Sequence, residues 1–149
     1  DAVGTGDALD LRGKAAIAQA KVAYNMFETT FSGEAWKTLA KLGAQVQRPL
    51  WASTSTKNPA YHDTMYVDEL IGAHSVNTLP DATMEAFADH GTVAETIAID
   101  VDGARSNLLA LQNIGIDMTA VADQLESEGV ASFQQSFNDL LAVLESKRK

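Results

Sequence analysis

A polar loop near the middle of the chain carries residues whose types suit the binding of an anion. Residues 53–58 read Ser-Thr-Ser-Thr-Lys-Asn and follow a short extended segment. They supply hydroxyl groups, one ammonium group and backbone N–H groups, a combination that suits a phosphate. In folds built on parallel strands, ligands bind beside the carboxyl ends of the strands. The loop, which contains Ser53, Thr54 and Lys57, is therefore a candidate phosphate site, and an ordinary solvated loop is the alternative.

A second extended segment follows about twenty residues later and ends in further polar groups. It covers residues 75–79 and carries Asn77 and Thr78 near its carboxyl end. Between the two segments, Asp63 can cap a short helix that stops at Gly72. If the two strands are parallel neighbours, Asn77 and Thr78 converge on the same edge as the polar loop.

The elements that must position these groups are mostly helices. Apolar spacing, caps and glycine stops predict helices near residues 7–31, 34–42, 63–71, 81–90, 103–114, 118–128 and 132–147, with strands at 50–53 and 75–79. From residue 92 the pattern changes, and the alternation of Ile97, Ile99 and Val101 favours an extended connection over a third strand. The alternating order in the middle of the chain is typical of parallel strands joined by crossover helices.

The last helices depend on two local signals. Gly129 is expected to end one helix, and Ser132 with Gln135 forms a capping box for the next. In that final helix, an apolar stripe predicts packing against a core. It consists of Phe133, Phe137, Leu140, Leu141 and Leu144.

Two short strands do not make a parallel sheet on their own. Parallel sheets are buried on both faces and contain several strands, and unpaired strand edges invite aggregation. The chain is therefore either a helical domain with an unusual insert or part of an α/β barrel or open sheet. We favour the second interpretation.

Composition excludes several classes of partner and chemistry. The 149-residue chain has a net charge of −9, which argues against nucleic-acid and anionic-membrane partners. The absence of cysteine excludes disulfides and thiolate chemistry. No signal peptide or apolar run of about 20 residues is present, so a cytoplasmic location is expected. His62, His74 and His90 lack metal-ligand spacing, and Ser53 has no evident base, so neither a metal site nor a nucleophilic triad is expected.

The central runs of sequence resemble those of transaldolases, in particular the longer, actinobacterial-type branch of that family. The resemblance covers essentially the whole chain, and the chain does not begin with methionine, which fits an internal start. The runs that carry it are Arg-Pro-Leu-Trp-Ala-Ser-Thr at 48–54, Lys-Asn-Pro-Ala-Tyr at 57–61, Asp-Thr-Met-Tyr-Val-Asp-Glu-Leu at 63–70 and Ser-Val-Asn-Thr-Leu-Pro at 75–80.

This resemblance implies the carboxyl-terminal part of an (αβ)8 barrel. Residues 50–53 and 75–79 then correspond to the last two barrel strands, the seventh and the eighth. Residues 1–102 belong to the barrel, and residues 103–149 form a helical extension that packs on it. The implied partner is the amino-terminal part of the same barrel, which supplies the missing strands.

The family transfers a dihydroxyacetone unit from a ketose phosphate to an aldose phosphate in the pentose phosphate pathway. The donor forms a Schiff base with a lysine on an earlier strand, without a metal or organic cofactor. Catalytic residues are therefore expected upstream, and this chain alone is predicted to be inactive. None of its lysines at 14, 21, 37, 41 and 57 matches the catalytic motif, and the first four are expected to face solvent from helices.

The resemblance leaves a binding role for residues of this chain. Family members use a serine at the end of the seventh strand, with a basic residue shortly after it, to hold the substrate phosphate. Ser53 matches the serine. Shorter members place an arginine two residues later, where this chain has Ser55, so Lys57 is the nearest cation. Two alternatives stay open: a non-catalytic helical interaction module, and another Schiff-base barrel of the aldolase type.

Overall fold

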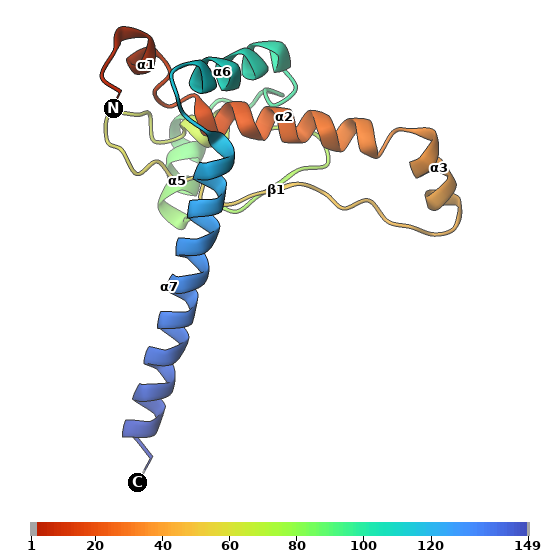
Figure 1. The fold of residues 1–149 in the computed structure, drawn as a ribbon. Coiled ribbons are helices and arrows are strands. Elements are labelled where there is room, and N and C mark those ends of the chain that lie inside the picture. The colour runs from red at the N-terminus through yellow and green to blue at the C-terminus, as the bar shows by residue number, and fades with distance from the viewer. Residues whose placement is uncertain (1–2, 149) are drawn as a thin grey trace. The chain divides into compact units, whose positions relative to one another are not determined.

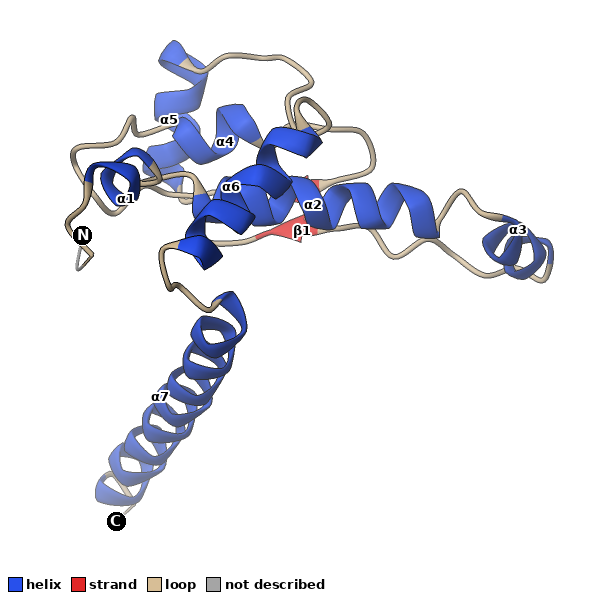
Figure 2. Cartoon of the chain, turned by 45° about the horizontal axis from the view of Figure 1, so that its top comes forward, coloured by secondary structure: helices blue, strands red, loops and turns tan. Residues whose placement is uncertain are grey.

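The computed structural model describes residues 3–148, which are mostly helical (Figures 1 and 2). The chain divides into two compact units, Asp1–Ala110 and Leu111–Lys149. The expected boundary at residues 102 and 103 stays a prediction. The elements in chain order are α1 (Gly6–Asp10), α2 (Ala15–Thr30), α3 (Glu34–Lys41), β1 (Leu50–Trp51), α4 (Met65–Glu69), β2 (Val76–Asn77), α5 (Asp81–His90), α6 (Val101–Asn113) and α7 (Met118–Ser146).

The two strands form a parallel pair, as the sequence predicts. Leu50 lies opposite Val76, and Trp51 lies opposite Asn77. Two backbone hydrogen bonds join the strands. Val76 N donates to the carbonyl of Pro49 at 2.9 Å, and Thr78 N donates to the carbonyl of Trp51 at 3.0 Å. Both strands are shorter than predicted. Strand β1 ends before Ser53, whose φ of 57° turns the chain out of the extended conformation.

The first predicted helix is broken into two. Helix α1 ends at Asp10, and α2 starts at Ala15. Between them Gly13 has φ of 75°, a left-handed conformation that interrupts a helix and that glycine adopts without steric cost. Thr5 caps α1, because its side chain accepts a hydrogen bond from Ala8 N.

The core of the first unit lies between α2 and the segments on either side of β2. Its buried members are Tyr24, Leu70 and Ile97. The Tyr24 hydroxyl donates to the carbonyl of Ala73 at 2.9 Å. Burial raises the pKa of Tyr24, and the carboxylates of Glu28 and Glu95 add to the rise. The hydroxyl therefore stays protonated and joins α2 to the turn before β2.

Close packing at the core explains why residue 72 is a glycine. A β-carbon at Gly72 would lie 2.3 Å from Cγ2 of Ile97 and 3.3 Å from the Tyr24 ring. Ile97 itself lies in a turn before α6. The extended connection predicted for residues 92–101 is therefore wrong at its carboxyl end, where Val101 already begins α6.

A buried lysine corrects a second expectation. Lys21 does not face solvent: its ammonium group donates to Oε2 of Glu69 at 2.9 Å, and the residue is buried. The contact joins α2 to the end of α4. Helix α6 is tied to α2 as well, because Arg105 donates to Oδ1 of Asn25 at 2.7 Å. Lys37 and Lys41 on α3 are exposed, as expected.

The second unit contains one long helix in place of the two predicted. Helix α7 runs through Gly129, which is helical and has no atom near enough to contact an added β-carbon. The expected stop at Gly129 and the capping box at Ser132 are therefore wrong. The actual cap is Asp117, whose carboxylate accepts from Thr119 N and Ala120 N.

The apolar stripe of α7 does not pack against a core within the described chain. Phe133 is 82% exposed, and Phe137, Leu140, Leu141 and Leu144 are also exposed. The prediction of core packing is not met here, because no buried residue belongs to this helix in the described chain. None of the helices in residues 3–148 has both the length and the apolar character needed to cross a membrane.

Candidate functional site

The polar loop after β1 turns back on itself at Ser53. Ser53 is exposed, and its left-handed backbone is unusual for a residue other than glycine, asparagine or aspartate. Such conformations are found preferentially at functional sites. The turn places Ser53 and the following residues along one side of a cavity of about 390 Å³.

The cavity brings together most of the residues predicted as phosphate ligands. Ser53, Thr54 and Lys57 all line it, whereas Asn77 and Thr78 do not. The other walls are apolar or aromatic and come from β1, α2, α4 and the loop before α4. They are formed by Leu50, Trp51, Ala52, Ala16, Ala20, Tyr61, Tyr66 and Leu70. Polar groups at one side of an apolar cavity are typical of small-molecule sites.

Lys57 provides the positive charge of this cavity. Its side chain is exposed, and its ammonium group contacts the hydroxyl of Ser55. No carboxylate of residues 3–148 forms an ion pair with it, so its charge is not neutralised within the described chain. An exposed cation beside a serine hydroxyl and apolar walls can attract and hold a phosphate.

Thr54 has a structural role, which differs from the binding role predicted for Ser53. It is buried, at 3% exposed, and its hydroxyl donates to Oδ1 of Asn77 at 2.7 Å and also lies 3.3 Å from the carbonyl of Thr78. The hydroxyl of Thr78 in turn donates to the carbonyl of Trp51 at 3.1 Å. Asn77 and Thr78 thus fasten the ends of β1 and β2 together, and Thr54 fixes the start of the loop.

Replacing Thr54 with valine tests this fastening. Valine keeps the shape but leaves the side-chain oxygen of Asn77 without its donor, so we expect a loss of about 1–3 kcal/mol in the free energy of unfolding. Urea unfolding of the chain measures it. Thr92→Val is the control, because Thr92 is exposed. Equal losses in the two variants would show that the Thr54 contact contributes nothing.

Trp51 has an unsatisfied donor close to the same cavity. Its Nε1 is buried and has no hydrogen-bond partner among the described residues. Buried donors are nearly always paired, so this atom is expected to meet an acceptor outside the described chain. Sequence alone does not predict it, because it does not give the direction of the Trp51 side chain on β1.

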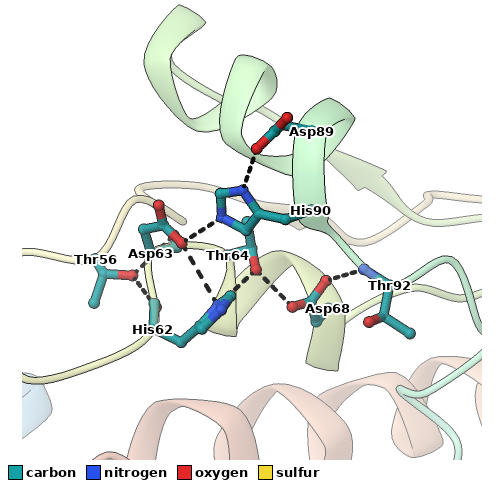
Figure 3. Close-up of polar contacts among 8 residues, drawn as sticks. All are labelled: Thr56, His62, Asp63, Thr64, Asp68, Asp89, His90 and Thr92. Carbon is teal, nitrogen blue, oxygen red and sulfur yellow. Dashed lines mark hydrogen bonds and ion pairs between the residues drawn. The ribbon is translucent and has the colours of Figure 1, made fainter.

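His62 and His90 both lie beside the Asp63 carboxylate, an arrangement that their spacing in the sequence does not predict. Asp63 Oδ1 lies 2.9 Å from Nε2 of His90 and 3.5 Å from Nδ1 of His62 (Figure 3). The hydrogen bond with His90 lowers the pKa of Asp63, and the same bond, followed by that with Asp89, raises the pKa of His90. His74 lies elsewhere, in the turn before β2. Because His62 and His90 are far apart in the chain, only the fold brings them together.

Comparison with known proteins identifies the family. The model of the transaldolase/fructose-6-phosphate aldolase family matches residues 2–144. The chain belongs to this family. A mostly helical chain with a parallel strand pair is consistent with part of the TIM-type barrel that the family suggests.

Individual transaldolases match almost all of the chain. A protein named transaldolase from Parafrankia sp. is 52% identical over 143 residues, which is 95% of this chain and 39% of that protein. Transaldolase 2 of Streptomyces avermitilis is 49% identical over 148 residues, covering 99% and 40%. The transaldolase of Thermobifida fusca is 46% identical over 140 residues, covering 93% and 38%. The chain therefore spans about two-fifths of the length of these relatives.

Proposed function

We propose that this chain is the carboxyl-terminal part of a transaldolase. The enzyme transfers a dihydroxyacetone unit between sugar phosphates, converting sedoheptulose 7-phosphate and glyceraldehyde 3-phosphate to erythrose 4-phosphate and fructose 6-phosphate in the pentose phosphate pathway of the cytoplasm. The observation that carries the proposal is the match of residues 2–144 to the family, together with about 50% identity to proteins named transaldolase.

In this proposal β1 and β2 are the seventh and eighth strands of an (αβ)8 barrel. Residues 1–102 belong to the barrel and residues 103–149 form its helical extension. Leu50 on β1 is 53% exposed, although parallel strands are normally buried on both faces. The amino-terminal part of the same barrel is the partner that covers such surfaces and supplies the remaining strands.

The phosphate of the sugar binds between Ser53 and Lys57. Support comes from their position on one cavity directly after β1, from the turn at Ser53 and from the charge of Lys57, which pairs with no carboxylate of residues 3–148. Thr54 contributes by fixing the loop, because its hydroxyl is already bonded to Asn77. Lysine binds phosphate as a point charge, without the two-pronged geometry that arginine offers.

The covalent chemistry belongs to residues upstream of this chain. A neutral lysine amine adds to the ketose carbonyl and loses water to form a Schiff base, which then serves as the electron sink for cleavage of the carbon–carbon bond. No cofactor takes part in this reaction. The chain alone therefore binds sugar phosphate at most weakly and does not turn it over.

Lys57→Ala in the complete enzyme, the longer protein that contains this chain, tests the proposal. A charge-assisted hydrogen bond to phosphate contributes about 1.5–3 kcal/mol, so we expect KM for phosphorylated donors to rise roughly tenfold or more. KM for an unphosphorylated ketose should not change. Lys41→Ala on α3 removes an equal charge away from the cavity and serves as the control. An unchanged KM for phosphorylated donors in Lys57→Ala contradicts the assignment.

A second candidate function follows from the family's own description, which also names fructose-6-phosphate aldolase. Such an enzyme uses the same Schiff-base chemistry but releases free dihydroxyacetone. The two candidate activities are distinguished by incubating the complete enzyme with fructose 6-phosphate alone. Accumulation of dihydroxyacetone supports the aldolase, whereas turnover that requires an aldose phosphate acceptor supports the transaldolase.

A further inference from the structure

Three potential metal ligands meet at the surface of the first unit. His62 and Asp63 lie in the segment before α4, and His90 is the last residue of α5. One nitrogen of each imidazole and one oxygen of the carboxylate lie within 4.8 Å of one another. In Figure 3 both rings are directed toward the Asp63 carboxylate, and the ring planes are nearly perpendicular, at 82°.

The distances suit a small ion with tetrahedral geometry. Two ligand atoms bound to zinc at 2.0–2.1 Å lie about 3.3 Å apart when the angle between them is tetrahedral. The distances from Asp63 Oδ1 are 2.9 Å to His90 and 3.5 Å to His62, one slightly below this value and one slightly above it. All three ligand atoms lie within 4.8 Å of one another, so rotation of these exposed side chains can bring them to tetrahedral spacing.

A neighbouring carboxylate already orients the imidazole of His90. Nδ1 of His90 lies 3.0 Å from Oδ2 of Asp89, which leaves Nε2 directed at Asp63. A carboxylate on the far nitrogen is the usual support of a metal-bound histidine, because it fixes the tautomer and makes the ligand more basic. Nδ1 of His62 lies 2.9 Å from Oγ1 of Thr64, which donates its proton to Asp68. On binding, His62 exchanges this contact for the ion and carries its ring proton on Nε2.

We propose that His62, Asp63 and His90 bind one divalent transition-metal ion, zinc being the best match. Two imidazoles and one carboxylate favour such an ion over magnesium or calcium, which prefer oxygen ligands throughout. The exposure of all three residues leaves the fourth position to water. This proposal departs from the expectation drawn from sequence spacing, which pointed to no metal site.

The ion links the segment before α4 to the end of α5 and takes no part in sugar chemistry. The hydroxyl of Thr56 lies 2.9 Å from the carbonyl of His62 and 3.0 Å from that of Asp63 (Figure 3). The polar loop at residues 53–58 is thereby anchored to the backbone of two ligands. Binding joins this segment to the end of α5 and steadies the loop that carries Ser53 and Lys57.

Titration of the metal-free chain with zinc chloride in a calorimeter tests the site. We expect one zinc per chain, and affinity at least tenfold lower in His62→Asn and in His90→Asn. Asp89→Asn should weaken binding roughly tenfold, as loss of a supporting carboxylate does. Magnesium should not compete.

His74→Asn is the matched control. This substitution removes the third histidine, and asparagine tolerates the backbone φ of 58° found at His74. It should bind zinc as the unchanged chain does. Equal affinity of the unchanged chain and His90→Asn, or an equal loss in His74→Asn, overturns the proposal.

Imidazole NMR signals of the unchanged chain decide the matter if a variant fails to fold. Zinc should shift the signals of His62 and His90 and leave those of His74 in place. If neither His62 nor His90 responds, or if His74 responds as strongly as they do, the site does not exist.

Discussion

Borohydride should fix a ketose phosphate to a lysine of the complete enzyme and leave this 149-residue chain unlabelled. A Schiff base between lysine and the donor carbonyl is reduced by hydride at its imine carbon, which converts it into a stable secondary amine. Only a lysine that is neutral and placed against the carbonyl forms that imine. The proposed function puts such a lysine upstream of this chain.

Apart from Lys57, no lysine of residues 3–148 lines the cavity beside Ser53. Lys21 is buried against Glu69, and Lys37 pairs with Glu34. Lys41 is exposed on α3. Lys57 alone among the lysines of the described residues lines the cavity that holds Ser53, so it is the one internal competitor for the role of nucleophile.

Intact mass measurement after reduction gives the answer. The complete enzyme should gain the mass of one donor-derived adduct, Lys57→Ala should gain it too at saturating donor, and borohydride without donor is the control. Label on the isolated chain would refute the placement of the nucleophile. No label on either protein would favour the alternative of a non-catalytic helical module over any Schiff-base enzyme.

Local patterns predicted the elements that depend on local chemistry. Helices at 34–41 and 81–90, and a parallel pairing of the two strands, follow from caps, apolar spacing and the order of elements. The rule that ligands bind at carboxyl ends of parallel strands predicts a site beside Ser53. The structure has a cavity there, and ligand binding in it stays a prediction. That rule needs no knowledge of side-chain contacts.

Glycine was the main source of error in the helices. The helix predicted at 7–31 runs through Gly13 and the predicted stop lies at Gly129, yet Gly13 is left-handed and Gly129 is helical. Glycine permits both conformations, so its presence alone does not choose between them. The choice is made by what surrounds it in the folded chain.

Contacts between distant segments could not be predicted from the sequence at all. Lys21 on α2 is buried because Glu69, 48 residues later, meets its ammonium group. His90 reaches Asp63 across 27 residues in the same way. In both cases the local sequence around each residue gives no sign of its partner, and only the packing of elements brings the two together.

Ile97→Ala should cost the first unit about 2–5 kcal/mol, the range for removing a large aliphatic side chain from a core. Ile97 is 0% exposed and packs with Tyr24 and Leu70. The side chain fills the space that the absence of a β-carbon at Gly72 leaves open. A loss of this size is a large fraction of the 5–15 kcal/mol that stabilises an ordinary domain.

Urea unfolding followed by tryptophan fluorescence measures the loss, and two variants calibrate it. Ile97→Val removes one methyl group and should cost about 0.5–1.5 kcal/mol. Ile99→Ala makes the same change as Ile97→Ala two residues along, at a position that is 57% exposed, and should stay within about 0.5 kcal/mol. If Ile97→Ala costs no more than Ile99→Ala, then Ile97 does not join α2 to the segment before β2. The position of the polar loop, whose cavity has walls from α2 and Leu70, would then need another support.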